Sequence, residues 1–266
     1  MKVSPTSKSF FYLCILLSIV FILIRGLEQS LFNKKVLEDT EQSTSLNEAS
    51  NDIMSKIFKD IEEREYNISF DPKVGKYQSP NRKHNIRTYF EPGKWQMQNR
   101  VDTLGIAWKL AFTTNGIYAD GKRFTKTEKD PKITVSENQI DFVYPHFTEQ
   151  YFNEQKGVRQ NFIIHKAPEK AKELTVQLEI EGMQATQIQE GEIQFANKNK
   201  TLTYSNLKAW DATGKLVEAI MKLSEDKMNI GLKVILDQVT FPLTIDPIVA
   251  NGDPTNADAL LESNQA

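Results

Sequence analysis

The histidines, which could do metal or acid–base chemistry, are few and widely spaced in this chain. The three histidines are His84, His146 and His165, and their spacing matches no metal-binding motif. His165 falls on the polar phase of an alternating stretch, which favours a solvated histidine over a metal ligand. Serine nucleophile elbows, glycine-rich phosphate loops and the HExxH motif do not occur in the sequence. The sequence therefore predicts no catalytic, cofactor-binding or metal-ligating residue, no cofactor, and a protein that is not an enzyme.

Carboxylates lie close together in the sequence in pairs such as Glu62 with Glu63 and Glu190 with Glu192. We expect the first pair on a helix surface and the second in a turn. A retaining glycosidase needs two carboxyl groups about 5 Å apart in a cleft, and distant strands could also supply such a pair. The oxygen-rich stretch 251–258 lacks the residue order of a calcium loop, so a solvated linker is the better interpretation.

The charge balance and the cysteine usage exclude several classes of protein. The chain has 33 basic and 35 acidic side chains, so it offers no basic stripe for nucleic acid. Its one cysteine, Cys14, lies in the apolar N-terminal run. The rest of the chain therefore has no disulfide framework, zinc cluster or cysteine nucleophile.

The first 25 residues are predicted to be a signal peptide or a membrane anchor. Lys2 and Lys8 precede an unbroken apolar block from Phe10 to Ile24. As a helix this block would span roughly 23 Å, which is short for a bilayer core of about 30 Å. The charged start resembles a signal peptide, but no pair of small residues follows the block to mark cleavage. Both alternatives imply an exported chain that is either anchored in the membrane by this segment or released at the cell surface.

Residues 26–50 are polar and are predicted to be a tether. A short amphipathic helix is predicted over 51–65, where Ile53, Ile57 and Ile61 recur at helical spacing. We expect its apolar stripe to pack on the domain that follows.

From residue 66 to residue 249 the apolar positions recur every second residue, which is typical of strands with one dry and one wet face. Glu91-Pro92-Gly93 and Asp120-Gly121 have the composition of tight turns. Further strand ends are predicted at Thr114-Asn115-Gly116 and at Asp246-Pro247. The alternating apolar sets are Ile86 to Phe90, Trp95 to Met97, Ile106 to Phe112, Val158 to Ile164, Leu174 to Ile180, Ile193 to Phe195, Leu202 to Tyr204, Val217 to Leu223, Met228 to Leu236 and Phe241 to Ile245.

This pattern predicts a mainly β fold, an antiparallel β-sandwich built as one large sandwich or as two small ones. In the second case the boundary is expected near 145–157. An N-terminal hydrophobic helix and the short amphipathic helix would precede the sandwich. Residues 250–266 are predicted to be a linker.

Six segments in order resemble one family, the secreted surface proteins of Bacteroidetes-type bacteria that carry FG-GAP (integrin-alpha-like) repeats after an N-terminal β-rich module. The resemblance implies that the Thr244-Ile245-Asp246-Pro247 strand closes this module and that 250–266 lead toward a propeller. No FG-GAP repeat is present in this sequence, so the resemblance implies a short or truncated member. The segments are Ile61 to Phe70, Tyr77 to Gly93, Gly116 to Phe124, Gly157 to Pro168, Leu202 to Lys215 and Phe241 to Gly252.

Three functions remain open on the sequence alone. The first is a non-catalytic exported module at the cell surface, structural or adhesion-associated, that precedes the absent propeller. The second is a sandwich that binds or hydrolyses surface glycans, with Trp95, Trp108 or Trp210 as stacking platforms. The third is a membrane-anchored periplasmic binding protein. The expected partners are the membrane, through the N-terminal segment, and a surface protein or glycan.

Overall fold

The computed structural model describes residues 25, 53–57, 61, 64–101, 107–198 and 200–251. The chain divides into two compact units, Met1–Ile61 and Glu62–Ala266. Residues 53–57, 61 and 64 are helical, within the range where the amphipathic helix is expected. The apolar block 10–24, the tether 26–50 and most of the linker 250–266 lie outside the described residues. None of the helical segments that the structure describes has the length and apolar character needed to cross a bilayer.

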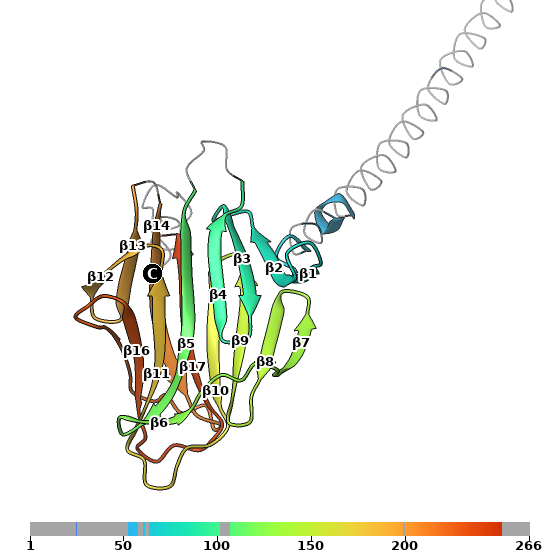
Figure 1. Ribbon diagram of the computed structural model, residues 1–266. Coiled ribbons are helices and arrows are strands. Elements are labelled where there is room, and N and C mark those ends of the chain that lie inside the picture. Colours follow the sequence, from blue (N-terminus) through green and yellow to red (C-terminus); the bar gives the residue numbers. More distant parts are fainter. Residues whose placement is uncertain are drawn as a thin grey trace, which may run out of the picture. The chain divides into compact units, whose positions relative to one another are not determined.

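The second unit is mainly β, as predicted, and its described strands form two antiparallel sheets (Figure 1). In the nine-stranded sheet the order is β1 (Ser69–Asp71), β2 (Lys76–Asn81), β3 (Ile86–Glu91), β4 (Lys94–Asn99), β5 (Lys109–Ala119), β11 (Glu173–Glu181), β16 (Asn229–Ile235) and β15 (Ala219–Leu223), and β6 (Lys122–Thr125) also pairs with β5. In the eight-stranded sheet the order is β12 (Gln184–Gln189), β13 (Glu192–Ala196), β14 (Thr201–Trp210), β17 (Leu243–Asn251), β10 (Gly157–Ile164), β9 (Phe147–Glu154), β8 (Gln139–Val143) and β7 (Lys132–Ser136).

One hydrophobic core joins the two sheets into a β-sandwich. Trp95 on β4 lies with its ring centroid 5.5 Å from that of Tyr151 on β9, in the opposite sheet. Phe112 on β5 contacts Phe195 on β13 edge to face at 5.3 Å. These inward side chains occupy the apolar phase of the alternating pattern, and their burial removes that face of each strand from water. The sandwich is therefore a single large one within the described residues.

Two strand ends predicted from turn-like residues are wrong. β5 does not stop at Thr114-Asn115-Gly116 but runs to Ala119, and its register with β11 shifts there by a β-bulge. Gly116 has a φ of 139°, and a Cβ on it would lie 2.6 Å from the carbonyl oxygen of Thr125, so only glycine fits this bulge. β17 likewise continues through Pro247 to Asn251, because its register with β14 shifts between Ser205 and Lys208.

The stretch 145–157, where a boundary was one expectation, contains β9. This strand lies between β8 and β10 in the eight-stranded sheet. Its inward positions alternate between apolar and polar residues, and the polar ones make the buried hydrogen bonds described below.

Candidate functional site

The structure places the three histidines at opposite ends of the β9–β10 hairpin. The His165 backbone N–H donates to the His146 carbonyl, at one end. His84 is buried near the other end, where its Nε2 lies 2.9 Å from the Gln155 carbonyl and its Nδ1 accepts from the Asn251 N–H. Burial lowers the pKa of His84 against the opposing effect of the Gln155 carbonyl, which favours a neutral ring with a structural role. In the described part of the chain no group of three or more His, Cys, Asp or Glu could hold a metal ion.

Two of the three tryptophans lie in the core. Trp95 is 1% exposed and stacks on Phe112 with ring centroids 5.0 Å apart. Trp108 is 6% exposed. Neither ring offers a face to a sugar in this structure. Trp210 is half-buried at the end of β14.

A carboxylate that the sequence did not single out lies inside the sandwich. Glu149 on β9 is fully buried, and its Oε2 accepts from the Gly93 N–H at 3.1 Å and from the Tyr144 hydroxyl at 3.2 Å. Burial raises the pKa of Glu149 to about 7 although these hydrogen bonds favour the charged form. Its position between the sheets makes it a structural group that no substrate can reach in this structure.

Two other buried acids also have partners within the fold. Asp246 on β17 pairs with the Arg159 guanidinium of β10, and burial raises its pKa against that pairing. Asp211 accepts the backbone N–H groups of Thr213 and Lys215 and so holds the turn that follows β14. The Thr213 hydroxyl, which also donates to it, is the main reason that the Asp211 pKa falls to about 2.

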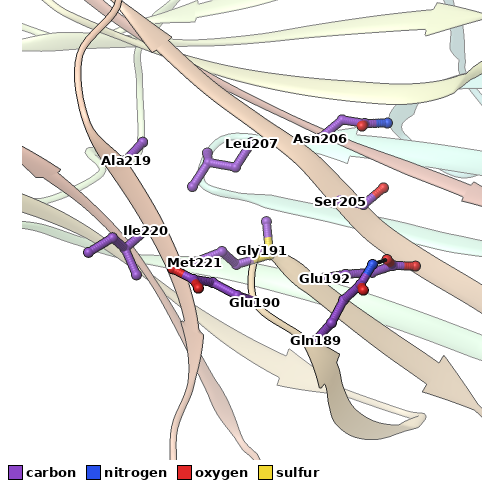
Figure 2. Close-up of a pocket in the computed structure, with 10 residues that line it drawn as sticks. All are labelled: Gln189, Glu190, Gly191, Glu192, Ser205, Asn206, Leu207, Ala219, Ile220 and Met221. Carbon is purple, nitrogen blue, oxygen red and sulfur yellow. Dashed lines mark hydrogen bonds between the residues drawn. The ribbon is translucent and has the colours of Figure 1, made fainter.

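The candidate functional site is a slot of about 500 Å³ where the two sheets meet at one side of the sandwich (Figure 2). Figure 2 shows that its walls come from β14 and β15 and that the β12–β13 turn closes one end. Both carboxylates of the predicted turn lie here: Glu190 is in the turn, and Glu192 is the first residue of β13. The lining residues are Gln189, Glu190, Gly191, Glu192, Ser205, Asn206, Leu207, Ala219, Ile220 and Met221.

The β14 wall of this slot forms because β14 stops pairing with β13 at this point. Pairing of β13 with β14 ends at Ile193 and Tyr204. Immediately afterwards the register with β17 shifts, and Asn206 takes a left-handed φ of 55°. Leu207 is then turned toward β15 and Asn206 away from it (Figure 2). The bulge thus presents residues 205–207 to the slot at the edge of β14 where pairing with β13 has ended.

The β15 wall is the end of the nine-stranded sheet, and one side chain holds part of its outer edge. Gln187 on β12 donates through Nε2 to the Met221 carbonyl at 3.0 Å and accepts through Oε1 from the Leu223 N–H at 2.9 Å. The amide side chain thereby makes the two hydrogen bonds that a neighbouring strand would make. We call this contact the Gln187 clasp.

We expect Gln187→Ala to lower the free energy of unfolding by about 1 to 2 kcal/mol, because a backbone carbonyl and an N–H each lose a partner. Urea denaturation of the full chain measures this loss. Gln184→Ala is the matched control, since Gln184 is exposed on the same strand, and its expected effect is below about 0.5 kcal/mol. Equal losses in the two variants would show that the clasp does not stabilise the edge.

Comparison of the chain with protein-family models finds no match, and comparison with curated proteins finds no significant one. The interpretation of the site therefore depends on its geometry. Sequence reasoning placed Glu190 and Glu192 in a turn but missed Gln187 and the strand edges. Gln187 gives no distinct local signal, because the strand that carries it reads QATQIQ and is mostly polar.

Proposed function

We propose that this chain is a non-catalytic, exported module of a bacterial surface protein, structural or adhesion-associated, of the kind that precedes an FG-GAP propeller. The N-terminal apolar block would deliver it to the membrane, as an anchor or as a cleaved signal. Its own domain would then serve as a rigid sandwich outside the cytoplasm.

The observation that carries this proposal is the position of the last described strand. β17 contains Thr244-Ile245-Asp246-Pro247 and lies between β14 and β10, in the interior of the eight-stranded sheet. β17 supplies backbone hydrogen-bond partners to both β14 and β10. Its inward residues Leu243, Ile245 and Val249 are fully buried. A sandwich that is closed by its last described strand is the kind of rigid unit that a spacer module requires.

The buried acids favour a structural role over a hydrolytic one. Glu149, Asp211 and Asp246 each bond groups within the fold. The burial of Trp95 and Trp108 likewise favours a structural role for these rings over sugar stacking. These contacts are the kind expected of a spacer or adhesion module.

Export is testable with the full chain produced in a bacterial host. We expect protease added to intact cells to degrade the chain, and the product to be found in the membrane fraction or outside the cells. A matched variant, Leu16→Asp with Leu17→Asp, places two charges in the apolar block and should leave the chain protected in the cytoplasm. Intact mass of the exported product distinguishes a cleaved signal from an anchor.

Protection of the unaltered chain in intact cells would contradict the proposal. Hydrolysis of surface glycans by the purified chain would contradict its non-catalytic part. FG-GAP coding repeats downstream in the same gene region would support the family resemblance, and an unrelated gene there would count against it.

A further inference from the structure

The outer edge of β15 is only partly covered. Among the described strands, β15 pairs with β16 alone. Directly before it the Val217 N–H donates to the Ala209 carbonyl of β14, so the open part of the second edge begins at Ala219, beside the slot of Figure 2. The Gln187 clasp covers this edge at Met221 and Leu223. Ala219, at the other end of the strand, lies beside the slot.

The hydrogen-bond phase of β15 shows which way the Ala219 backbone points. The Glu218 carbonyl accepts from the Ile235 N–H at 3.1 Å, and the Ser224 N–H donates to the Asn229 carbonyl at 2.8 Å, so even-numbered residues bond toward β16. The odd-numbered Met221 and Leu223 bond the other way, toward Gln187. Because the period of a strand is two, the N–H and C=O of Ala219 point into the slot.

The negative charge of the slot favours an extended ligand that carries a positive charge. Among the ten residues that line it, the ionisable ones are Glu190 and Glu192. Leu207 on the β14 wall and Ala219 on the β15 wall supply an apolar patch. A ligand with a cationic side chain next to an apolar one would complement this surface.

We propose that this slot binds an extended segment of a partner protein, which adds as a short strand to the edge of β15 with a lysine or arginine beside Glu190 and Glu192. The Ala219 backbone provides the first hydrogen bonds of this added strand. The proposal concerns the slot alone and holds wherever the chain is located.

In the absence of the partner, the Gln187 clasp occupies the β15 edge at Met221 and Leu223. An incoming strand that displaces the clasp extends its pairing from Ala219 to Leu223. The side chain of Gln187 therefore competes with the partner, and its removal leaves more of the edge available.

The probe is a fluorescent, capped heptapeptide of alternating lysine and valine, and its binding to the full chain is followed by anisotropy. Two further peptides serve as controls, one of alternating glutamate and valine and one of lysine and valine with N-methyl groups on alternate residues. The variants are Gln187→Ala and Ala219→Pro. Proline at 219 removes the N–H that points into the slot and leaves the β15–β16 hydrogen bonds in place.

We expect saturable binding of the lysine peptide, about fivefold tighter in Gln187→Ala and about five- to tenfold weaker in Ala219→Pro. The glutamate peptide should bind at least fivefold more weakly than the lysine peptide, and the N-methylated peptide should not bind. The N-methylated peptide tests strand pairing even if the proline variant does not fold.

Several results would overturn the proposal. These are a lysine peptide that binds neither the unaltered chain nor Gln187→Ala, equal binding of the N-methylated peptide, and equal binding of the glutamate peptide. Concentration-dependent dimerisation of the chain without peptide, abolished in Ala219→Pro, would instead make a second copy the occupant and would also overturn it.

Discussion

Replacement of Asn153 with alanine is expected to lower the free energy of unfolding by about 4 kcal/mol, because its side chain joins three segments that are distant in sequence. Asn153 is fully buried on β9. Its Nδ2 donates to the Tyr66 carbonyl at 3.1 Å and to the Pro80 carbonyl at 2.7 Å, and its Oδ1 accepts from Asn81 Nδ2 at 2.8 Å.

The loss is large because alanine cannot replace any of these bonds in a dry site. The Tyr66 carbonyl keeps the Ser79 hydroxyl as a donor, and Asn81 keeps the Glu154 carbonyl as an acceptor. The Pro80 carbonyl keeps a 3.5 Å contact with the Ser79 hydroxyl, and each of these buried groups loses one of its hydrogen-bond partners. The segment before β1 should also become more sensitive to protease, since Tyr66 is held to the sandwich through this asparagine.

Urea denaturation of the unaltered chain and of Asn153→Ala measures this loss of stability. Gln150→Ala is the matched control, because Gln150 lies on the same strand with its side chain on the other face and makes one hydrogen bond with Asn161. Its expected cost is below about 1 kcal/mol. A loss in Asn153→Ala no larger than in Gln150→Ala would mean that the buried network does not stabilise the sandwich.

Alternation was sufficient to predict the strands whose inward residues are uniformly apolar. β11 is the clearest case, since Leu174, Val176, Leu178 and Ile180 are all buried and the residues between them are not. The Pro92-Gly93 turn joins β3 and β4 as its composition predicts, with Glu91 opposite Lys94. In such strands the local sequence and the fold agree, so the period alone identifies the core face.

β9 was missed because its inward face is half polar. Phe147 and Tyr151 alternate on that face with Glu149 and Asn153, and all four are buried. A polar residue at a core position is tolerated only where distant segments supply hydrogen bonds, and those partners are not visible in the local pattern. The two strand ends placed wrongly, at Gly116 and Pro247, have the same origin, because bulges depend on the neighbouring strands.

The slot could not be predicted from local sequence at all. Its walls belong to different sheets, and whether β15 has an outer edge depends on the strand order of the whole sandwich. The left-handed Asn206 that turns β14 toward it is a single residue inside a ten-residue strand. Sequence patterns predict which face of a strand is buried, but long-range pairing decides which edges remain open.

Glu149 is expected to make the sandwich less stable as the pH rises from 4.5 to 7. Its pKa is raised by burial from an ordinary value of 4.5 to about 7. Within that window the folded chain holds a proton on Glu149 that the unfolded chain has lost, so each increase in pH favours the unfolded state. The contribution is fully present below pH 4.5 and is lost as the pH passes the folded pKa of about 7.

The expected total change is about 3 kcal/mol, since each pH unit between the two pKa values contributes about 1.4 kcal/mol. Other groups titrate in the same pH range, so the contribution of Glu149 is measured as a difference between two chains. The free energy of unfolding of the unaltered chain is subtracted from that of Glu149→Gln at each pH between 4 and 9. Glutamine accepts the same bonds from Gly93 and Tyr144 but carries no charge at any pH.

We expect this difference to rise by about 3 kcal/mol between pH 4.5 and pH 7 and to be level above about pH 7.5, with the glutamine variant the more stable at high pH. Glu169→Gln is the matched control for the loss of one carboxylate at an exposed position, and the change for Glu149→Gln should exceed its change. A flat curve for Glu149→Gln would show that the carboxyl group titrates alike in both states. A curve that falls with pH would mean that the hydrogen bonds from Gly93 and Tyr144 outweigh the cost of burial.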